Sequence, residues 1–314
     1  MTRRFVLPLA AGVLALAAQE TVFRVDVRLV RLLVTVKDTS GNLIGSLTKE
    51  QFRVFDNGAE QQIAVFERQT EQPLSVALLI DISGSTAKEL PYEIESVDRF
   101  LKALIAEGNP RDAASLYTFN HYVVLRSSFT RRLGRLQEAM KDLKAEAGTS
   151  LYDALYFASR EFRDRECRRI LVVVTDGGDT TSGRNFHDAL EAAQLADAVI
   201  YPILVMPIKA EVGRNIGGEN ALTMFAQGTG GRVFLPTVGK ELDAAFRQIL
   251  EELRTQYLVA YYPKDVPLTK NRFHRLEVRL DNPNLRPSTR SGYYGEYEST
   301  SEPGRPGKGP APIR

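Results

Sequence analysis

The stretch LLIDISGSTAKEL, residues 78–90, joins an apolar run to one carboxylate and two hydroxyls at alternate positions. Asp81, Ser83 and Ser85 end a strand-like segment and precede a segment with helical periodicity. Three interpretations compete for these side chains. They could cap the following helix, supply a catalytic serine, or form part of a metal site whose other ligands lie further along the chain.

Two more polar side chains occupy equivalent places later in the sequence. Thr149, in AGTSLYDAL, begins a predicted helix, and Asp176, in VVVTDGGD, ends a predicted strand. Because ligands of open α/β sheets bind where the strands end, we expect these two residues to converge with the first three. All five supply oxygen, which suits a hard cation such as Mg²⁺, with Mn²⁺ or Ca²⁺ as alternatives, and argues against zinc.

The segment that must position these residues, 74–255, alternates short apolar strands with amphipathic helices. Leu90, Val97 and Leu104, for example, keep the spacing of one helical face. Residues 232–238, RVFLPTV, are predicted to be its last short strand. Alternation at this period predicts a doubly wound α/β fold, with a mostly parallel sheet covered on both faces.

The segments on either side, 21–73 and 256–298, have the alternating pattern of β-strands. Asp56, Asn57 and Gly58 are typical of a tight hairpin turn. Each segment is about 50 residues long, which is marginal for an independent core. We therefore expect the two to pair into one small β-rich domain, with the α/β domain inserted between them.

The two ends of the chain differ from both domains. Residues 1–18 combine a basic start with a short apolar run and small residues, as a secretory signal peptide does, although an uncleaved anchor is the alternative. Residues 299–314 are rich in proline and glycine and are expected to be disordered. The protein is thus predicted to be periplasmic or extracellular.

Overall composition excludes several classes of protein. The formal charge of +2 and the absence of a basic stripe argue against a nucleic-acid partner. After removal of the signal segment no stretch is long and apolar enough to span a membrane. Cys167 is the single cysteine, so it forms no intramolecular disulfide and is interpreted as a small filler of the core edge.

The ordered motifs DISGS, GTSLYDAL and TDGGD resemble the metal-ion-dependent adhesion site of von Willebrand factor type A domains. The resemblance covers 74–255, and the flanking segments are similar to bacterial proteins that extend this domain with β segments. It implies that Ser83 and Ser85 bind the metal directly, Thr149 directly or through water, and Asp81 and Asp176 largely through water. A Glu or Asp of a protein partner would complete the coordination.

Departures from the family pattern limit what the resemblance implies. Lys88 and Glu89 stand where some integrin relatives place the acidic ligands of an adjacent calcium, so we expect no second cation. Asp179 is interpreted as a supporting or loop-capping group.

The resulting hypothesis is a non-catalytic, metal-dependent module for protein binding or adhesion, of unknown oligomeric state. A structural envelope scaffold without functional metal and a hydrolase using the Asp81–Ser83 loop are the alternatives. A hydrolase needs a base, and none of the histidines, at 121, 187 and 274, stands in a triad context. Four tyrosines are assigned to sheet packing rather than to a ligand platform: Tyr261, Tyr262, Tyr293 and Tyr294.

Overall fold

The computed structural model of the protein describes residues 29–68, 72–162, 165, 167–206, 216–266 and 273–295. The expected signal peptide and the expected disordered tail lie outside these residues. The domain boundaries given above remain predictions.

A five-stranded sheet forms the centre of the α/β part, in the order β7-β6-β5-β8-β9. Its strands are β5 (Leu74–Asp81), β6 (Ala113–Phe119), β7 (Val123–Thr130), β8 (Arg168–Thr175) and β9 (Ala198–Leu204). β5 pairs in parallel with β6 and β8, β8 pairs in parallel with β9, and β7 is antiparallel to β6. Every residue of β5 is buried, which explains why its sequence is a continuous apolar run instead of an alternating one.

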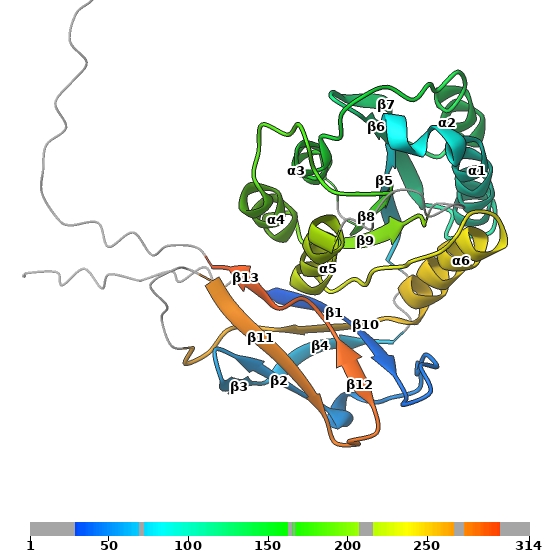
Figure 1. The fold of residues 1–314 in the computed structure, drawn as a ribbon. Helices are drawn as coiled ribbons and strands as arrows, with labels where there is room; N and C mark the ends of the chain where they lie inside the picture. The colour runs from blue at the N-terminus through cyan, green and yellow to red at the C-terminus, as the bar shows by residue number, and fades with distance from the viewer. Residues whose placement is uncertain are drawn as a thin grey trace, which may run out of the picture.

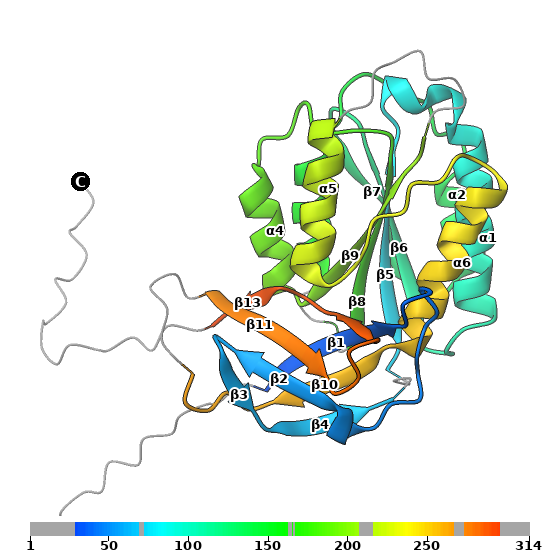
Figure 2. The same cartoon turned by 60° about the horizontal axis from the view of Figure 1, so that its bottom comes forward.

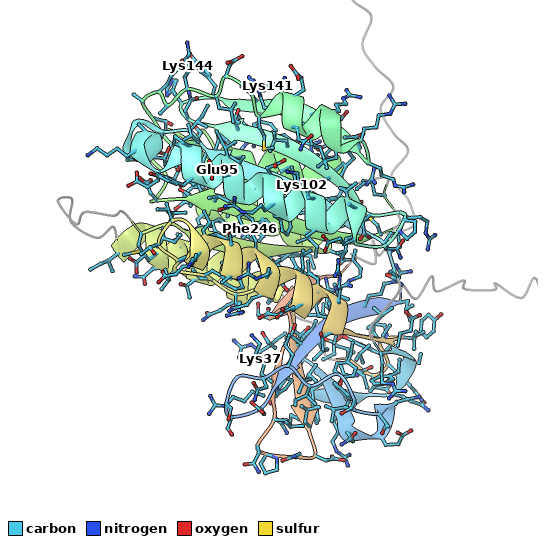
Figure 3. All side chains as sticks on the ribbon, turned by 90° about the vertical axis from the view of Figure 1, so that its right-hand side faces the viewer. Lys37, Glu95, Lys102, Lys141, Lys144 and Phe246 are labelled. Atoms are coloured by element: carbon cyan, nitrogen blue, oxygen red, sulfur yellow. The ribbon has the colours of Figure 1, made fainter. Side chains whose placement is uncertain are left out.

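Helices cover both faces of this sheet (Figures 1 and 2). One layer consists of α1 (Leu90–Ala106), α2 (Leu133–Ala139) and α6 (Lys240–Thr255). The other consists of α3 (Leu151–Glu161), α4 (Phe186–Leu195) and α5 (Ile216–Thr229). Phe100 of α1 and Phe246 of α6 meet with ring centroids 4.8 Å apart, and Figure 3 shows Phe246 between these two helices. The predicted doubly wound α/β fold is confirmed.

The N- and C-terminal segments form two four-stranded antiparallel sheets. The first is ordered β12-β1-β10-β4 and the second β13-β11-β2-β3. Their strands are β1 (Val30–Lys37), β2 (Phe52–Asp56), β3 (Ala59–Gln61), β4 (Ile63–Glu67), β10 (Tyr257–Tyr261), β11 (Phe273–Leu280), β12 (Arg286–Ser288) and β13 (Gly292–Tyr294). Because β1 pairs with β10 and β2 with β11, the two ends of the chain share one apolar core, as predicted.

The predicted hairpin turn is present between β2 and β3. Asn57 and Gly58 have φ values of 48° and 84°, the left-handed conformation that a two-residue turn of this kind requires. A short turn, η1 (Lys49–Gln51), precedes the hairpin. β4 then leaves the hairpin for the other sheet, so the two sheets are connected within the first segment.

The prediction of a strand at 232–238 was wrong. This segment runs beside β9 and exchanges backbone hydrogen bonds with it, but only Ile203 and Phe234 form a bridge. Pro236 accepts a hydrogen bond from Met206 through its carbonyl and has no N–H to return, so the ladder cannot continue. None of the helices in the described part of the chain has the length and apolarity to cross a membrane.

Buried polar side chains join the β-sheets to the α/β part. Glu252 of α6, whose side chain is 4% exposed, accepts hydrogen bonds from Lys37 of β1 and from Arg232. Gln256, directly after α6, donates to Thr35 of β1 at 3.0 Å. Figure 3 places Lys37 at this junction, and Figure 2 shows the β-sheets at the end of the central sheet where β5 begins.

Candidate functional site

Strands β5 and β8 end side by side at the C-terminal edge of the central sheet. Ile80 and Val174 are partners in the parallel ladder, so Asp81 and Thr175 come together at the C-terminal edge. The Thr175 hydroxyl donates to Asp81 Oδ2 at 2.6 Å, and the Ser83 backbone N–H donates to Asp81 Oδ1 at 2.8 Å. The carboxyl group of Asp81 is thereby held in place by both of the loops that leave the sheet here.

The chain after Asp81 folds into a tight turn, η2 (Gly84–Lys88), before α1 begins. The hydroxyls of Ser83 and Ser85 are 3.0 Å apart, and Ser83 is 3% exposed whereas Ser85 is exposed. The Thr86 hydroxyl donates to the carbonyl of Ser83 at 2.9 Å and to that of Asp81 at 3.2 Å. The alternate spacing of the two serines therefore turns both hydroxyls to one side, as a shared ligand would need.

Asp176, the next residue after β8, faces the same turn. Burial raises the pKa of its carboxyl, and the hydroxyl of Ser85, which reaches that carboxyl, opposes the rise. Gly177 and Gly178 follow, and α5 packs directly on them. A Cβ on Gly218 of α5 would lie 2.6 Å from the backbone nitrogen of Gly178. The glycines of the TDGGD motif and of α5 thus allow this close approach, which fixes the loop that carries Asp176.

Thr149 lies in a third loop at this edge, just before α3. The Glu146 N–H donates to the carbonyl of Ile82 at 2.9 Å, which holds this loop against the turn of Ser83. On its other side, the Thr149 N–H donates to the Thr180 hydroxyl at 2.9 Å. Thr149 is buried at 7% exposure, and none of the hydrogen bonds found among the described residues joins its hydroxyl to the other four side chains.

The structure therefore brings four of the five predicted side chains into direct contact and places Thr149 between the loops that carry them. Burial raises the pKa of Asp81 to about 7, the hydroxyl of Thr175 and the N–H of Ser83 oppose this, and the charge of Asp176 adds to it. Two carboxylates that repel each other in a buried setting favour a bound cation. The donors are oxygens only, so Mg²⁺, Mn²⁺ or Ca²⁺ fits this chemistry.

Three residues near this cluster were not identified from the sequence. Thr175 stands at the end of β8, and its hydrogen bond to Asp81 becomes apparent only from the pairing of β5 with β8. Glu89 and Glu93, at the start of α1, are both buried; the charge of Glu89 acts on Asp176, and the charges of Glu89 and Asp176 act on Glu93. Glu93 left a signal in the sequence, because it falls on the apolar face predicted for this helix, three residues after Leu90.

Asp179 acts as the predicted loop cap. It accepts from the Tyr152 N–H at 3.1 Å, in the first turn of α3, and from the N–H of Ser182 at 3.3 Å. Across the described ranges, no group of three or more His, Cys, Asp or Glu side chains is arranged to hold a metal ion. The candidate site differs from such a group, because only two of its five side chains are carboxylates and the other three are hydroxyls.

None of the histidines in the described part of the chain forms a hydrogen bond with Ser83 or Ser85, although His121 lies against the Thr149 loop, where its carbonyl accepts from the Ser150 hydroxyl at 3.0 Å. His121 and His187 are exposed, and His274 contacts Asp56 in the β-sheets at 3.0 Å. Tyr261 and Tyr293 pack in the apolar core of the β-sheets, as predicted, and donate to the same carboxylate at 2.7 and 2.8 Å. Two further tyrosines and the cysteine complete the set: Tyr262 is 54% exposed, Tyr294 packs on Phe273, and Cys167 is half-buried with a free thiol.

Part of the α/β region is similar to a known protein family. Residues 76–178, about a third of the chain, match the model of the von Willebrand factor type A domain. No curated protein sequence matches the chain.

Several solved structures are partly similar. BatB from Bacteroides thetaiotaomicron is 16% identical and covers 57% of this chain and 98% of its own, with a TM-score of 0.44. The vWF domain of the type V pili tip protein Mfa5 from Porphyromonas gingivalis is 15% identical over 57% and 94%, with a TM-score of 0.48. The PilB minor pilin from Streptococcus sanguinis is 13% identical over 59% and 62%, with a TM-score of 0.46. Residues 76–178 of this chain are therefore similar to von Willebrand factor type A domains.

Proposed function

We propose that the chain is an exported, non-catalytic module that binds a protein partner through a divalent cation. The cation is held by Asp81, Ser83, Ser85, Thr149 and Asp176, and the partner supplies an Asp or Glu carboxylate to it. The family match supports a role in protein–protein interaction. The proposal of export depends on the signal-like sequence of residues 1–18.

One observation carries this proposal. Two carboxylates, the buried Asp81 and the half-buried Asp176, share one sheet edge and are linked through Thr175, Ser83 and Ser85, and the charges that act on them are acidic. A divalent cation at this place would relieve their repulsion. Since three of the five donors are neutral hydroxyls, the ion would keep part of its positive charge and attract one more anionic oxygen.

The position of the cluster suits recognition of a large partner. The site lies where β5 and β8 end, whereas the two antiparallel sheets join the other end of the central sheet (Figure 2). Ser85 is exposed, so the cluster is accessible on the side of η2. The β-sheets can therefore support the domain without covering the proposed binding face.

The environment of the serines supports a non-catalytic role. The hydroxyls of Ser83 and Ser85 contact each other, and the nearest acid–base groups among their partners are Asp81 and Asp176. A serine nucleophile needs a positioned base such as histidine. His121 and His187 are solvent-exposed, and His274 belongs to the distant β-sheets.

Metal binding is tested by thermal unfolding of the purified chain with Mg²⁺ or Mn²⁺ and with EDTA. A cation at one hundred times its Kd stabilises the folded state by about 2.7 kcal/mol, so the midpoint should rise with metal and fall back with chelator. Asp176→Ala should abolish the response. A midpoint unaffected by either cation up to millimolar concentration would contradict the proposed site.

Partner binding is tested by affinity capture from a cell-envelope extract in Mg²⁺, followed by elution with chelator. The wild type should release its partner into the chelator, and Asp81→Ala should capture little. Equal capture by both proteins, with and without chelator, would instead favour the structural scaffold in which metal has no part.

A further inference from the structure

Glu93 is a carboxyl group that the fold buries without a hydrogen-bond partner. It lies in the first turn of α1, its side chain is 0% exposed, and neither Oε1 nor Oε2 has a partner among the described residues. Burial of an ionisable group without compensation costs several kcal/mol. A native chain retains such a group where a bound ion or water compensates it, so Glu93 calls for a functional explanation.

Glu93 lies on the inner face of α1, the helix that follows the loop of the two serines. Leu90, Glu93 and Val97 are buried on one face of the helix, whereas Glu95 is exposed on the outer face, where Figure 3 shows it. The Glu93 N–H donates to the carbonyl of Glu89, the N-cap of α1, at 3.1 Å, so Glu93 stands in the first helical turn after η2. The carboxyl is thus committed to the interior beside the loop that carries the two serines.

The charges that act on Glu93 come from the same site. Burial raises its pKa well above the usual range, and the charges of Asp81, Asp176 and Glu89 add to that rise. All three neighbours are acidic. The group is therefore close enough to the two aspartates to interact with them electrostatically, and a cation between them would act on Glu93 as well.

We propose that Glu93 is a charge-balancing residue of the divalent-cation site, which strengthens cation binding from behind the ligands, through space or through a bound water. This inference rests on the proposed function. With Asp81 and Asp176 it brings the local carboxylates to three, so the cation is held more tightly than by the two aspartates alone before any guest arrives. The domain would then hold its cation in the absence of a partner. The partner's carboxylate would serve to recognise the loaded site, and the cation would not need it to stay bound.

A purely structural role for Glu93 predicts a different result. A protonated, neutral acid that only fills space could be replaced by glutamine, which has the same shape and no charge, without any change in cation affinity. A charge-balancing role predicts that the same replacement weakens cation binding. Even at an effective dielectric constant of about 20, removal of one negative charge near a divalent ion should weaken binding about tenfold or more.

The experiment measures Mn²⁺ binding to the full chain by calorimetry and by the paramagnetic signal of free Mn²⁺. Wild type, Glu93→Gln and the control Glu95→Gln are compared. The control removes the same charge from the exposed face of the same helix. We expect Glu95→Gln to bind like wild type and Glu93→Gln to bind at least about tenfold more weakly, with the apo thermal midpoint not lowered.

Two further variants separate the failures. Asp176→Ala should lose Mn²⁺ binding. Glu93→Leu fills the same space with an apolar group and should bind Mn²⁺ as weakly as we expect for Glu93→Gln, so it replaces that variant if the glutamine protein folds poorly. Suppose that the wild type binds Mn²⁺, Asp176→Ala does not, and a folded neutral variant of Glu93 binds it as tightly as the wild type. This result overturns the inference and leaves the proposed function intact. Absence of Mn²⁺ binding by the wild type overturns both.

Discussion

Replacement of Asp81 by asparagine should stabilise the metal-free protein at neutral and alkaline pH. The carboxyl is 0% exposed, and burial raises its pKa from 3.8 to about 7. A rise of this size corresponds to on the order of 4 kcal/mol of preference for the protonated form in the folded state. Asparagine has no proton to lose, so at no pH does it carry the cost of a buried negative charge.

The sign of the pH dependence follows from the direction of the shift. Below pH 3.8 Asp81 is protonated in both the folded and the unfolded chain, and its contribution to stability is complete. As pH rises from there to about 7, the unfolded chain ionises first and stability is lost. The advantage of Asp81→Asn should therefore grow with pH and level off above about pH 7, at on the order of 4 kcal/mol.

Urea unfolding in EDTA, at several values between about pH 5 and about pH 8, measures this advantage as a difference in free energy of unfolding. Asp281→Asn is the matched control, because that carboxylate is 52% exposed and its replacement should change stability by less than about 1 kcal/mol at any pH. The reasoning is refuted if the difference between Asp81→Asn and wild type stays constant over this range, or if asparagine destabilises the protein throughout.

Three other substitutions test the framework around the site. Asp56→Ala leaves the buried phenol of Tyr261 and the half-buried phenol of Tyr293 without their acceptor and should lower the free energy of unfolding by about 3 kcal/mol, measured by urea denaturation. Gly218→Ala drives a methyl into the backbone of Gly178, so it should destabilise by about 1–3 kcal/mol and weaken the Mg²⁺-dependent thermal shift, whereas Gly134→Ala, which meets no atom within 4 Å, should do neither. Glu252→Gln removes the charge that binds two cationic side chains at the junction and should lower the thermal midpoint by the equivalent of about 2 kcal/mol.

The architecture was largely predictable because periodicity along the chain reports burial directly. The all-buried β5 reads as an uninterrupted apolar run, and the turn at Asn57 and Gly58 reads from residue types that accept positive φ. The prediction failed at residues 232–238, where the composition suits a strand. Pro236 has no N–H to donate, so this segment pairs with β9 through the single bridge between Ile203 and Phe234.

The sequence by itself determined which oxygen donors the chain offers and in what order, because Asp81, Ser83 and Ser85 are close in sequence and their alternate spacing survives folding. Which other groups join them was decided by tertiary structure. Thr175 reaches Asp81 only because β5 and β8 pair in register, and Glu93 comes near both aspartates only because α1 packs with that face inward. Electrostatic interactions depend on the distance between charged groups, and the distance between groups on different strands and helices is not encoded in local spacing.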